Sequence, residues 1–441
     1  MDSEKKDIRE WYQTAFADFE NSLNGGASLP FHAVRKKAIA RFAELGFPST
    51  RNEDWKYTNI APLLKHQFQP VAEAPDIAAE SLAPFLFKGL DADRLVFVNG
   101  VYNEALSSVS NLPDGVILDT LENAFTTHAD TVTQALGKTV SYEEETFSAL
   151  NTAFARTGVF LSVPAGVVLE RPLYILHVSK TEGREFLAAP RNLFLFGDNS
   201  QARLVEGHYN LDGGTSFKNS VTEISVGADA LVEHVRIQDE SKDAFHFATT
   251  QVEQATGSNY TSVAIDLGGS LVRNNLNVHL AEERCEAHLI GFYFGSGRQL
   301  IDNHTMIDHA VPNCESNELY KGILDDRAHG VFNGKVMVRP DAQKTNAFQQ
   351  NQAILLSDDA HIDSKPQLEI FADDVKCSHG ATVGELDDES LFYLRARGIG
   401  EQEAHAMLRL AFARDIFNYI KIDAVRERLE ELVVERFNNK A

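Results

Sequence analysis

Between about residue 160 and residue 380 this chain lacks helical periodicity and consists of short apolar runs separated by turn residues. In Leu271–Leu280 and in Thr261–Leu267, apolar and other residues alternate, which is typical of strands with one buried face. Gly-Ala-Asp at 227–229 and Gly-Ser-Asn at 257–259 are turn signals between such runs. A doubly wound α/β fold requires a helix between strands, so this pattern argues against one.

So many short strands favour a stacked solenoid with coils roughly 27–41 residues apart. A jelly roll or a sandwich would account for only some of them. We therefore predict a mainly β chain with a β-solenoid core at 156–384. Flanking it are a mostly helical N-terminal region at 1–155, with a hairpin near 95–102 around Asn-Gly, and a C-terminal helical domain at 385–441. We expect these helical segments to cap the two ends of the solenoid.

Charge and cysteine content narrow the functional classes. The formal net charge of −23 argues against a nucleic-acid partner, because phosphate binding requires a cationic surface. The longest apolar runs are too short to span a membrane, and the charged start lacks the apolar stretch of a secretory signal. Three cysteines in 441 residues do not form a disulfide framework, so we expect a reducing, cytoplasmic location.

Cys377 and His379 stand at the junction between the strand-rich region and the C-terminal helices. Residues i and i+2 of a strand point to the same face, about 6–7 Å apart, so a thiol and an imidazole are presented together. Two ligands are too few for structural zinc or for an iron–sulfur cluster. Either a second chain supplies the missing ligands, or Cys377 is a small buried hydrophobe and His379 a turn histidine.

Other ligand-type residues carry weaker signals. Cys285 and His288 would face opposite sides of a strand, and Cys314 follows Pro-Asn in an expected loop. We interpret His304 and His309 as strand-face residues. The sequence contains neither a phosphate-binding loop of the Gly-x-x-x-x-Gly-Lys-Ser/Thr type nor a Gly-x-Ser-x-Gly nucleophile motif. Any ATP hydrolysis would therefore belong to a partner.

Two amphipathic helices are predicted after residue 400. Their apolar stripes include the residues that we expect to bind a partner: Leu408, Phe412, Ile416, Val425 and Leu429. The stripes could equally pack on the protein's own core. A docking platform would require apolar surface that remains exposed in the monomer.

Several segments resemble the SufB/SufD family of iron–sulfur cluster assembly proteins, and in particular its SufD branch. They are Arg51–Thr58 (RNEDWKYT), Gly334–Gln352, Phe371–Gly384 and Leu391–Ile399. The resemblance covers essentially the whole chain. It implies a right-handed parallel β-helix between helical segments, and a scaffold subunit without turnover of its own.

The resemblance also implies partners and cargo. The expected partners are a SufB-like paralogue and an ABC-type ATPase, SufC, that binds the C-terminal helices. Cys377 and His379 match the family's Cys-Ser-His-Gly motif at the SufB interface, where a transient iron–sulfur cluster or iron is expected. A reduced flavin is associated with the whole complex, and the isolated chain could form a homodimer.

The resemblance leaves two other roles open, a SufB-like cluster scaffold and a β-solenoid enzyme acting on polysaccharide. Such enzymes use clustered carboxylates in an exposed groove. The tempting pairs are Asp358-Asp359 and Asp373-Asp374. Adjacent strand residues face opposite sides, so neither pair is a ready acid/base couple.

Overall fold

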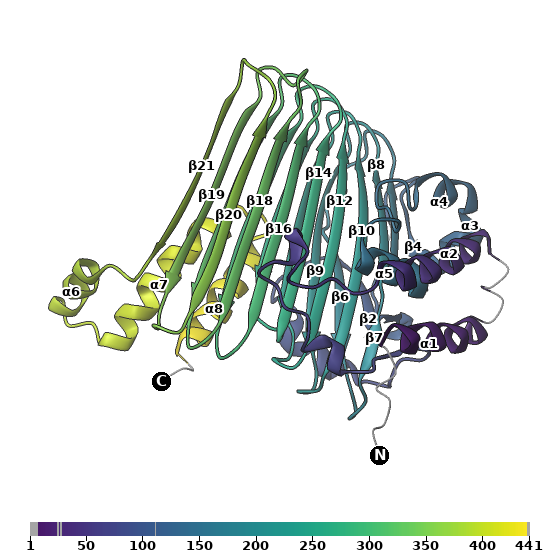
Figure 1. The fold of residues 1–441 in the computed structure, drawn as a ribbon, viewed down its shortest axis with the longest axis horizontal. Helices are drawn as coiled ribbons and strands as arrows, with labels where there is room; N and C mark the ends of the chain where they lie inside the picture. Colours follow the sequence, from purple (N-terminus) through teal and green to yellow (C-terminus); the bar gives the residue numbers. More distant parts are fainter. Residues whose placement is uncertain (1–7, 24–25, 27–28, 111, 439–441) are drawn as a thin grey trace.

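The computed structural model describes residues 8–23, 26, 29–110 and 112–438. The chain winds between two β-sheets and adds one strand to each sheet in every turn (Figure 1). We call the 11-stranded sheet sheet A and the 10-stranded sheet sheet B. About eight turns form a solenoid with helices before and after it. The prediction of a mainly β chain with a β-solenoid between helical segments is confirmed.

From β8 to β21 the strands alternate between the two sheets along the chain. Sheet A contains β1 (Gln69–Pro70), β4 (Ile117–Thr120), β5 (Val159–Val163), β7 (Phe186–Ala188), β8 (Arg191–Phe196), β10 (Ser216–Val226), β12 (Phe245–Gln254), β14 (Leu271–Leu280), β16 (Leu300–His309), β18 (His329–Val338) and β20 (His361–Ile370). Sheet B contains β2 (Asp93–Val98), β3 (Val101–Tyr102), β6 (Leu173–Ser179), β9 (Gln201–Asn210), β11 (Leu231–Asp239), β13 (Asn259–Asp266), β15 (Glu286–Gly295), β17 (Glu315–Leu324), β19 (Asn346–Leu355) and β21 (Lys376–Gly384).

The helices lie before and after the main run of strands. The α-helices are α1 (Ile8–Ser22), α2 (Pro30–Leu45), α3 (Leu121–Thr127), α4 (Ala129–Ala135), α5 (Thr146–Phe154), α6 (Asp388–Ala396), α7 (Glu401–Phe417) and α8 (Asp423–Asn438). Short 3₁₀ helices are η2 (Glu53–Trp55), η3 (Leu63–Lys65), η4 (Ala79–Phe85) and η5 (Glu104–Leu106).

A regular register links successive turns. Leu271, Leu300 and His329 follow one another on β14, β16 and β18, so one turn uses about 29 residues. Several turns contain a residue with left-handed backbone, such as Asp229 (φ 53°) and Asp326 (φ 55°). Aspartate tolerates this region better than most residues because its short side chain bonds locally. Residues a full turn apart in sequence therefore become neighbours about 4.8 Å apart.

The sheet of the solenoid begins earlier than residue 156. Strand β2 pairs with β6 in parallel and is joined to β3 by a hairpin, in which Asn99 and Gly100 both have positive φ (51° and 82°). This is the backbone that a two-residue Asn-Gly turn requires. The region 1–155 thus contributes helices and strands of both sheets, β1 and β4 in sheet A and β2 and β3 in sheet B.

The two faces of a strand meet different surroundings. On β14, Val278 and Leu280 point into the solenoid and pack in the same cluster as Leu289 of β15. On β13 the apolar residues Val263 and Ile265 point outward instead and pack beneath α7 and α8. We expected one buried face for each strand, but both faces of β13 are buried because helices cover the outer one.

Charged groups occupy part of the interior. The Lys218 ammonium lies 2.8 Å from Glu240, and the His246 ring lies 2.6 Å from the other Glu240 oxygen, with all three side chains almost fully buried. Burial alone would raise the pKa of Glu240, but the Lys218 charge and the His246 contact hold that pKa well below its usual value. Buried charges of this kind are tolerated only when they are paired.

The N-terminal segment 51–58 crosses the outer face of sheet A. The Trp55 ring lies 3.9 Å from the guanidinium of Arg273, which binds the Asp302 carboxylate at 2.7 Å. Thr58 donates a hydrogen bond to the same carboxylate. Because Asp302 is fully buried there, the Arg51–Thr58 motif anchors the N-terminal region to the middle turns.

The C-terminal helices α7 and α8 lie against the outer face of sheet B. Phe417 and Phe437 pack edge-on against Phe292 and Phe294 of β15. Our expectation that these helices cap the end of the solenoid is wrong for α7 and α8, because their apolar residues pack on the apolar outer face of sheet B. Helix α6 projects away from the sheets and has no buried residue (Figure 1).

Candidate functional site

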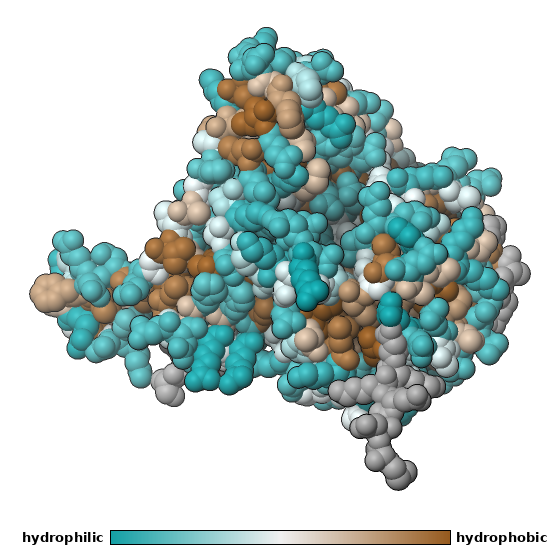
Figure 2. Space-filling model, in the orientation of Figure 1, coloured by the Kyte–Doolittle hydropathy of each residue, from teal (hydrophilic) through white to brown (hydrophobic). Residues whose placement is uncertain are grey.

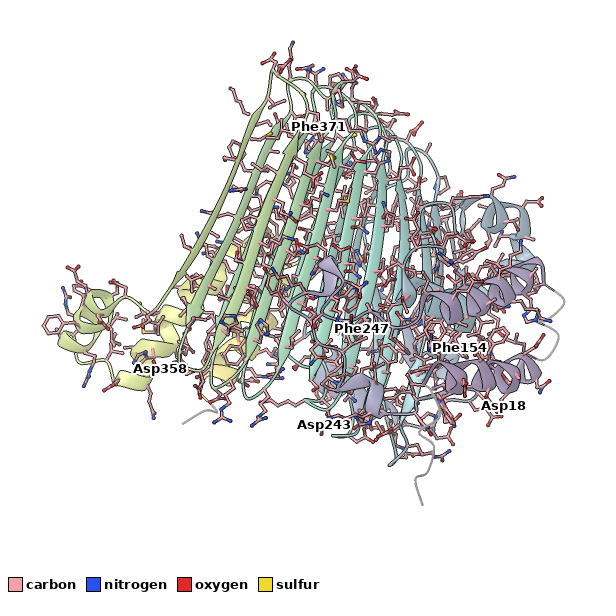
Figure 3. All side chains as sticks on the ribbon, viewed as in Figure 1. Asp18, Phe154, Asp243, Phe247, Asp358 and Phe371 are labelled. Atoms are coloured by element: carbon pink, nitrogen blue, oxygen red, sulfur yellow. The ribbon has the colours of Figure 1, made fainter. Side chains whose placement is uncertain are left out.

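The last turn of the solenoid is open. Strands β20 and β21 end their sheets, each with one neighbouring strand in the described chain. Every residue of β6 is buried, whereas those of β20 and β21 are half-buried or exposed. Phe371 between them is 61% exposed. Figure 2 shows apolar residues at the top of these turns, where Figure 3 labels Phe371. Unpaired edge strands with exposed apolar side chains beside them are a template for another chain.

Cys377 and His379 lie on β21 and face the interior of this open turn. Their register partners on β19 are Ala347 and Gln349, both buried. Gln349 points toward sheet A. Its amide and the hydroxyl of Thr305, on β16 of that sheet, both donate hydrogen bonds to the carboxylate of Glu318. Cys377 is half-buried and His379 is exposed, so a molecule that covers the last turn can reach both.

The chemistry of Cys377 suits a ligand that is completed from outside. Burial raises the pKa of its thiol, and a hydrogen bond with the backbone of Ala347 offsets this only in part. The thiol is therefore protonated at neutral pH, and a metal must displace that proton to bind the sulfur. Cys377 and His379 together supply two ligands, fewer than a cluster requires.

A buried carboxyl group lies behind His379. Glu318, Gln349 and His379 are successive register partners on β17, β19 and β21. The Gln349 amide donates to Glu318 at 2.6 Å, and Thr305 donates to the other carboxylate oxygen. Burial raises the pKa of Glu318 to about 7, although these two hydrogen bonds oppose the rise. A carboxyl group that titrates near neutrality thus lies two strands from the predicted ligands, and the sequence alone did not reveal it.

Other ligand-type residues of the sequence, namely Cys285, His288 and Cys314, are separated from this turn. Cys285 is buried, whereas His288 lies on the outer face of sheet B, so the two do face opposite sides. Cys285 and Cys314 stack at the start of β15 and β17, where both thiols approach the Glu282 carbonyl, at 3.0 and 3.3 Å. Their 29-residue spacing equals one turn, a signal that becomes readable once the turn length is known.

Two further histidines are held by neighbouring side chains. His304 lies 3.0 Å from Asp302 on the outer face of sheet A. His309 is buried and hydrogen-bonds Ser316 at 2.9 Å, and burial lowers its pKa to about 4. Both are strand residues, as the pattern predicted.

The structure distributes the predicted partner-binding residues unevenly. Ile416, Val425 and Leu429 are buried against sheet B, while Leu408 and Phe412 are half-buried. The first three pack on the protein's own core, so their side chains are not surface in this structure. Any docking through these helices must use other residues.

Exposed apolar residues remain on the C-terminal domain. Phe392 and Tyr393 of α6 are 74% and 56% exposed, and Met407 of α7 is also exposed. Helix α6, which carries Phe392 and Tyr393, lies at the opposite end of the molecule from α1 and α2 (Figure 1). Solvent-exposed aromatic residues on a projecting helix are typical of a contact surface.

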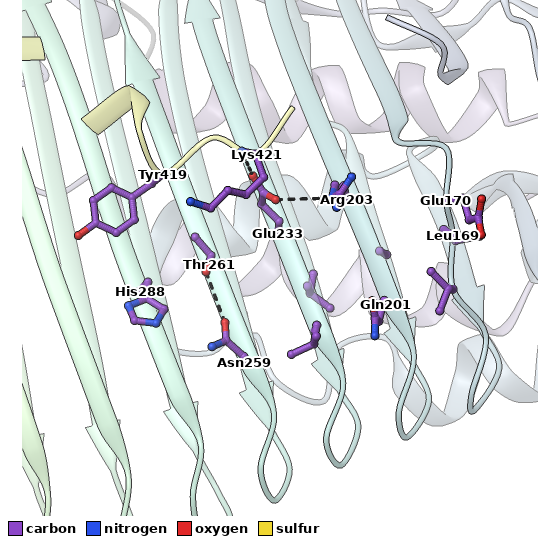
Figure 4. A pocket seen from close by; sticks show the side chains of 14 residues that line it. Leu169, Glu170, Gln201, Arg203, Glu233, Asn259, Thr261, His288, Tyr419 and Lys421 are labelled. Carbon is purple, nitrogen blue, oxygen red and sulfur yellow. Dashed lines mark hydrogen bonds and ion pairs between the residues drawn. The ribbon is translucent and has the colours of Figure 1, made fainter. Parts of the chain in front are cut away.

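A groove of about 610 Å³ lies between the outer face of sheet B and the loop after α7 (Figure 4). Glu233 accepts a hydrogen bond from the backbone of Lys421 at 2.8 Å and lies 3.8 Å from Arg203. Burial raises the pKa of Glu233 in this position. The hydrogen bond between Glu233 and Lys421 ties the loop after α7 to sheet B. Cys377 and His379 do not line the groove.

Among the described residues, no helix combines the length and the apolar character that crossing a membrane requires.

Comparison with known proteins connects this architecture to a family. Residues 177–412 match the SufBD core domain of the SUF system for iron–sulfur cluster assembly. Residues 6–175 match the N-terminal region of SufBD proteins. The two matches together span both the helical region and the solenoid.

Several relatives match most of the chain. An iron–sulfur cluster assembly SufBD family protein of Synechocystis is 33% identical over 408 residues, which cover 90% of this chain and 89% of the relative. The iron–sulfur cluster assembly protein SufD of Escherichia coli is 31% identical, with 90% and 91% covered. SufD of Bacillus subtilis is 27% identical, with 91% and 93% covered. This chain therefore belongs to the SufBD family of iron–sulfur cluster assembly proteins.

Proposed function

We propose that this chain is the SufD-type subunit of a complex that assembles iron–sulfur clusters. In this proposal it is a scaffold without turnover of its own, and a SufB-like paralogue covers its open last turn. The observation that carries the proposal is the orientation of Cys377 and His379 into the turn that the chain leaves uncovered. Two relatives whose matches cover 90% and 91% of this chain are named SufD.

The partner would complete both the sheets and the ligand set. A strand added to β20 or β21 would satisfy the unpaired backbone groups and cover the exposed apolar residues around Phe371. Ligands from the partner would join Cys377 and His379 around a nascent cluster or iron, which is cargo and leaves again. The flavin belongs, in this proposal, to the assembled complex and not to this chain alone.

The C-terminal domain would bind the SufC-like ATPase. The structure favours a contact through the exposed residues Phe392, Tyr393 and Met407, because the apolar stripes of α7 and α8 are largely used by sheet B. Deletion of both helices would uncover Phe292 and Phe294 and destabilise the core. Surface substitutions are therefore the appropriate test.

The central experiment co-expresses this chain with its SufB-like and SufC-like partners and measures iron and sulfide in the purified complex. We expect His379→Ala to leave the complex intact and to reduce iron and sulfide loading at least tenfold. His288→Ala, on the outer face of sheet B, is the matched control and should have no effect. Normal loading of the His379→Ala complex would contradict the proposed role of this histidine.

A second experiment separates the two interfaces. The double substitution Phe392→Ser with Tyr393→Ser should abolish co-purification of the ATPase while retaining the paralogue. Because α6 has no buried residue, we expect the variant to fold as the wild type does. Retention of the ATPase by this variant would mean that the ATPase binds elsewhere. A separate measurement of the molecular mass of the isolated chain in solution would show whether two copies pair through the open edges.

A further inference from the structure

A second group of ligand-type side chains lies on the outer face of sheet A, at its open edge. His329 lies on β18, while His361 and Asp363 lie on β20. One ligand atom from each of the three residues falls within 4.8 Å of the others. The Asp363 Oδ2 atom is 2.8 Å from His329 Nε2 and 3.4 Å from His361 Nε2. Two imidazole nitrogens thus converge on one carboxylate oxygen.

The register of the solenoid creates this arrangement. His329 and His361 are direct partners on neighbouring strands, and their ring centroids are 5.1 Å apart. Asp363 follows His361 by two residues and therefore shares its face. All three belong to the β18–β20 ladder, so the backbone hydrogen bonds between these strands set their relative positions.

The three side chains differ in how far they are exposed to solvent. The side chains of His329 and Asp363 are about three-quarters buried, at 27% and 25% exposure, whereas that of His361 is 65% exposed. Burial holds the His329–Asp363 pair in place, and the exposed His361 leaves one side of the cluster open. A site with three protein ligands and open positions can accept water or a further ligand.

We propose that His329, His361 and Asp363 form a binding site for a first-row divalent transition-metal ion, with Zn²⁺ and Fe²⁺ as the best-matched ions. Two histidines and one carboxylate are a common ligand set for such ions. An ion about 2.0–2.2 Å from each ligand atom requires those atoms to lie roughly 3–3.5 Å apart. The two distances from Asp363 Oδ2, 2.8 and 3.4 Å, are close to this range, and the two histidine nitrogens lie within 4.8 Å of each other. Binding would replace the hydrogen-bonded proton between His329 and Asp363.

The neighbouring charge does not oppose this assignment. Lys365 lies two residues beyond Asp363 on the same face, but its ammonium group pairs with the carboxylate of Glu53. This ion pair balances the Lys365 charge and brings the N-terminal segment 51–58 to the same edge. A negative carboxylate, Asp363, thus remains the principal charge among the three ligands.

This site is separate from Cys377 and His379. His361 is at the start of β20, near the end of the molecule where Figure 3 labels Asp358, and β21 begins at the opposite end beyond Phe371. At about 3.3 Å per residue, His361 and His379 are roughly 20 Å apart along the strands. The inference does not depend on the proposed function, although both sites lie on the same open turn.

The test uses the full-length, untagged protein after removal of metal with a chelator. Titration with Co²⁺, followed by its visible absorption, and with Zn²⁺, followed by calorimetry, should give one equivalent bound in the wild type. Asp363→Asn and His361→Ala should each weaken binding by about 100-fold or more, since removal of a direct ligand exceeds the effect of its supporting residues. Melting temperature without metal reports whether each variant is folded.

Two controls make the result decisive. His288→Ala removes a histidine that lies 3.9 Å from Glu286 but has no second histidine, and should leave binding unchanged. Cys377→Ser combined with His379→Ala should also leave it unchanged, which separates this site from the cluster ligands. Unaltered binding in both Asp363→Asn and His361→Ala, or loss only in the Cys377 and His379 variant, would overturn the proposal.

Discussion

The two ends of the solenoid are built from the same repeating turn but finished in opposite ways. At the first turns, β2 pairs with β6, and the segment around η4 packs on Tyr174 of β6 through Phe85 and Phe87. Every residue of β6 is buried. At the last turn, β20 and β21 carry the same backbone geometry with half-buried or exposed side chains. Because the repeat is shared, the difference lies in what covers it. A solenoid requires caps, so the uncovered end is where a partner is expected.

The largest expected difference comes from placing the same charge at each end. Val178→Lys in β6 buries an unpaired ammonium in the core and should cost more than about 5 kcal/mol, enough to prevent folding. Val383→Lys in β21, where the side chain is 52% exposed, should change stability by less than about 0.5 kcal/mol. Denaturant unfolding measures both, and similar losses would show that the last turn is covered.

A smaller contrast uses ion pairs. Arg191 and Glu223 near the first turns form a fully buried pair, and Glu223 also accepts hydrogen bonds from Gly137 and Thr139. Arg191→Met would leave this carboxylate buried and unpaired, at a cost of about 3–5 kcal/mol. Arg327→Met, which breaks an exposed pair with Asp359 toward the open end, should cost less than about 1 kcal/mol. Urea unfolding measures both losses of stability, and equal losses would argue against a difference between the two ends of the solenoid.

The smallest effect concerns Glu318, two strands from the open edge. Its pKa rises from 4.5 to about 7 on folding because of burial, so the folded state binds the proton more tightly than the unfolded state. Its contribution to stability is therefore full below pH 4.5 and is lost as the pH rises toward 7, by at most about 3 kcal/mol.

Glu318→Gln should remove that decline, so the difference in unfolding free energy between variant and wild type should grow in favour of the variant from pH 4.5 to pH 7.5. A constant difference would mean that Glu318 is solvated. Addition of a partner over the last turn should enlarge the effect, because it would exclude more water from this interior.

The solenoid could be predicted from the sequence because strand alternation and turn signals are local patterns. It could not tell which face of a strand points inward: the apolar residues of β13, such as Val263, face the helices and not the interior. The same ambiguity applies to Ile416 and Val425, because an apolar stripe on a helix has the same pattern whether it packs on its own core or on a partner.

The candidate site residues also fall into two groups, those that local sequence places together and those that only the fold brings together. Cys377 and His379 are two residues apart, so strand geometry alone places them on one face. Glu318 and His379, or His329 and His361, are brought together only by the register of successive turns. Turn lengths vary with the loops, so these neighbours were not visible before the structure was known.

The anchoring of the N-terminal segment has a consequence for biosynthesis. Glu53 pairs with Lys365 across 312 positions of the chain, and Thr58 and Trp55 contact residues that also appear much later. At about 5–20 residues per second, a ribosome needs roughly 15 to 60 s to deliver those contacts after the segment emerges. During that interval Trp55 has no finished surface to cover, so we expect this segment to be the part of the nascent chain that chaperones and proteases encounter first.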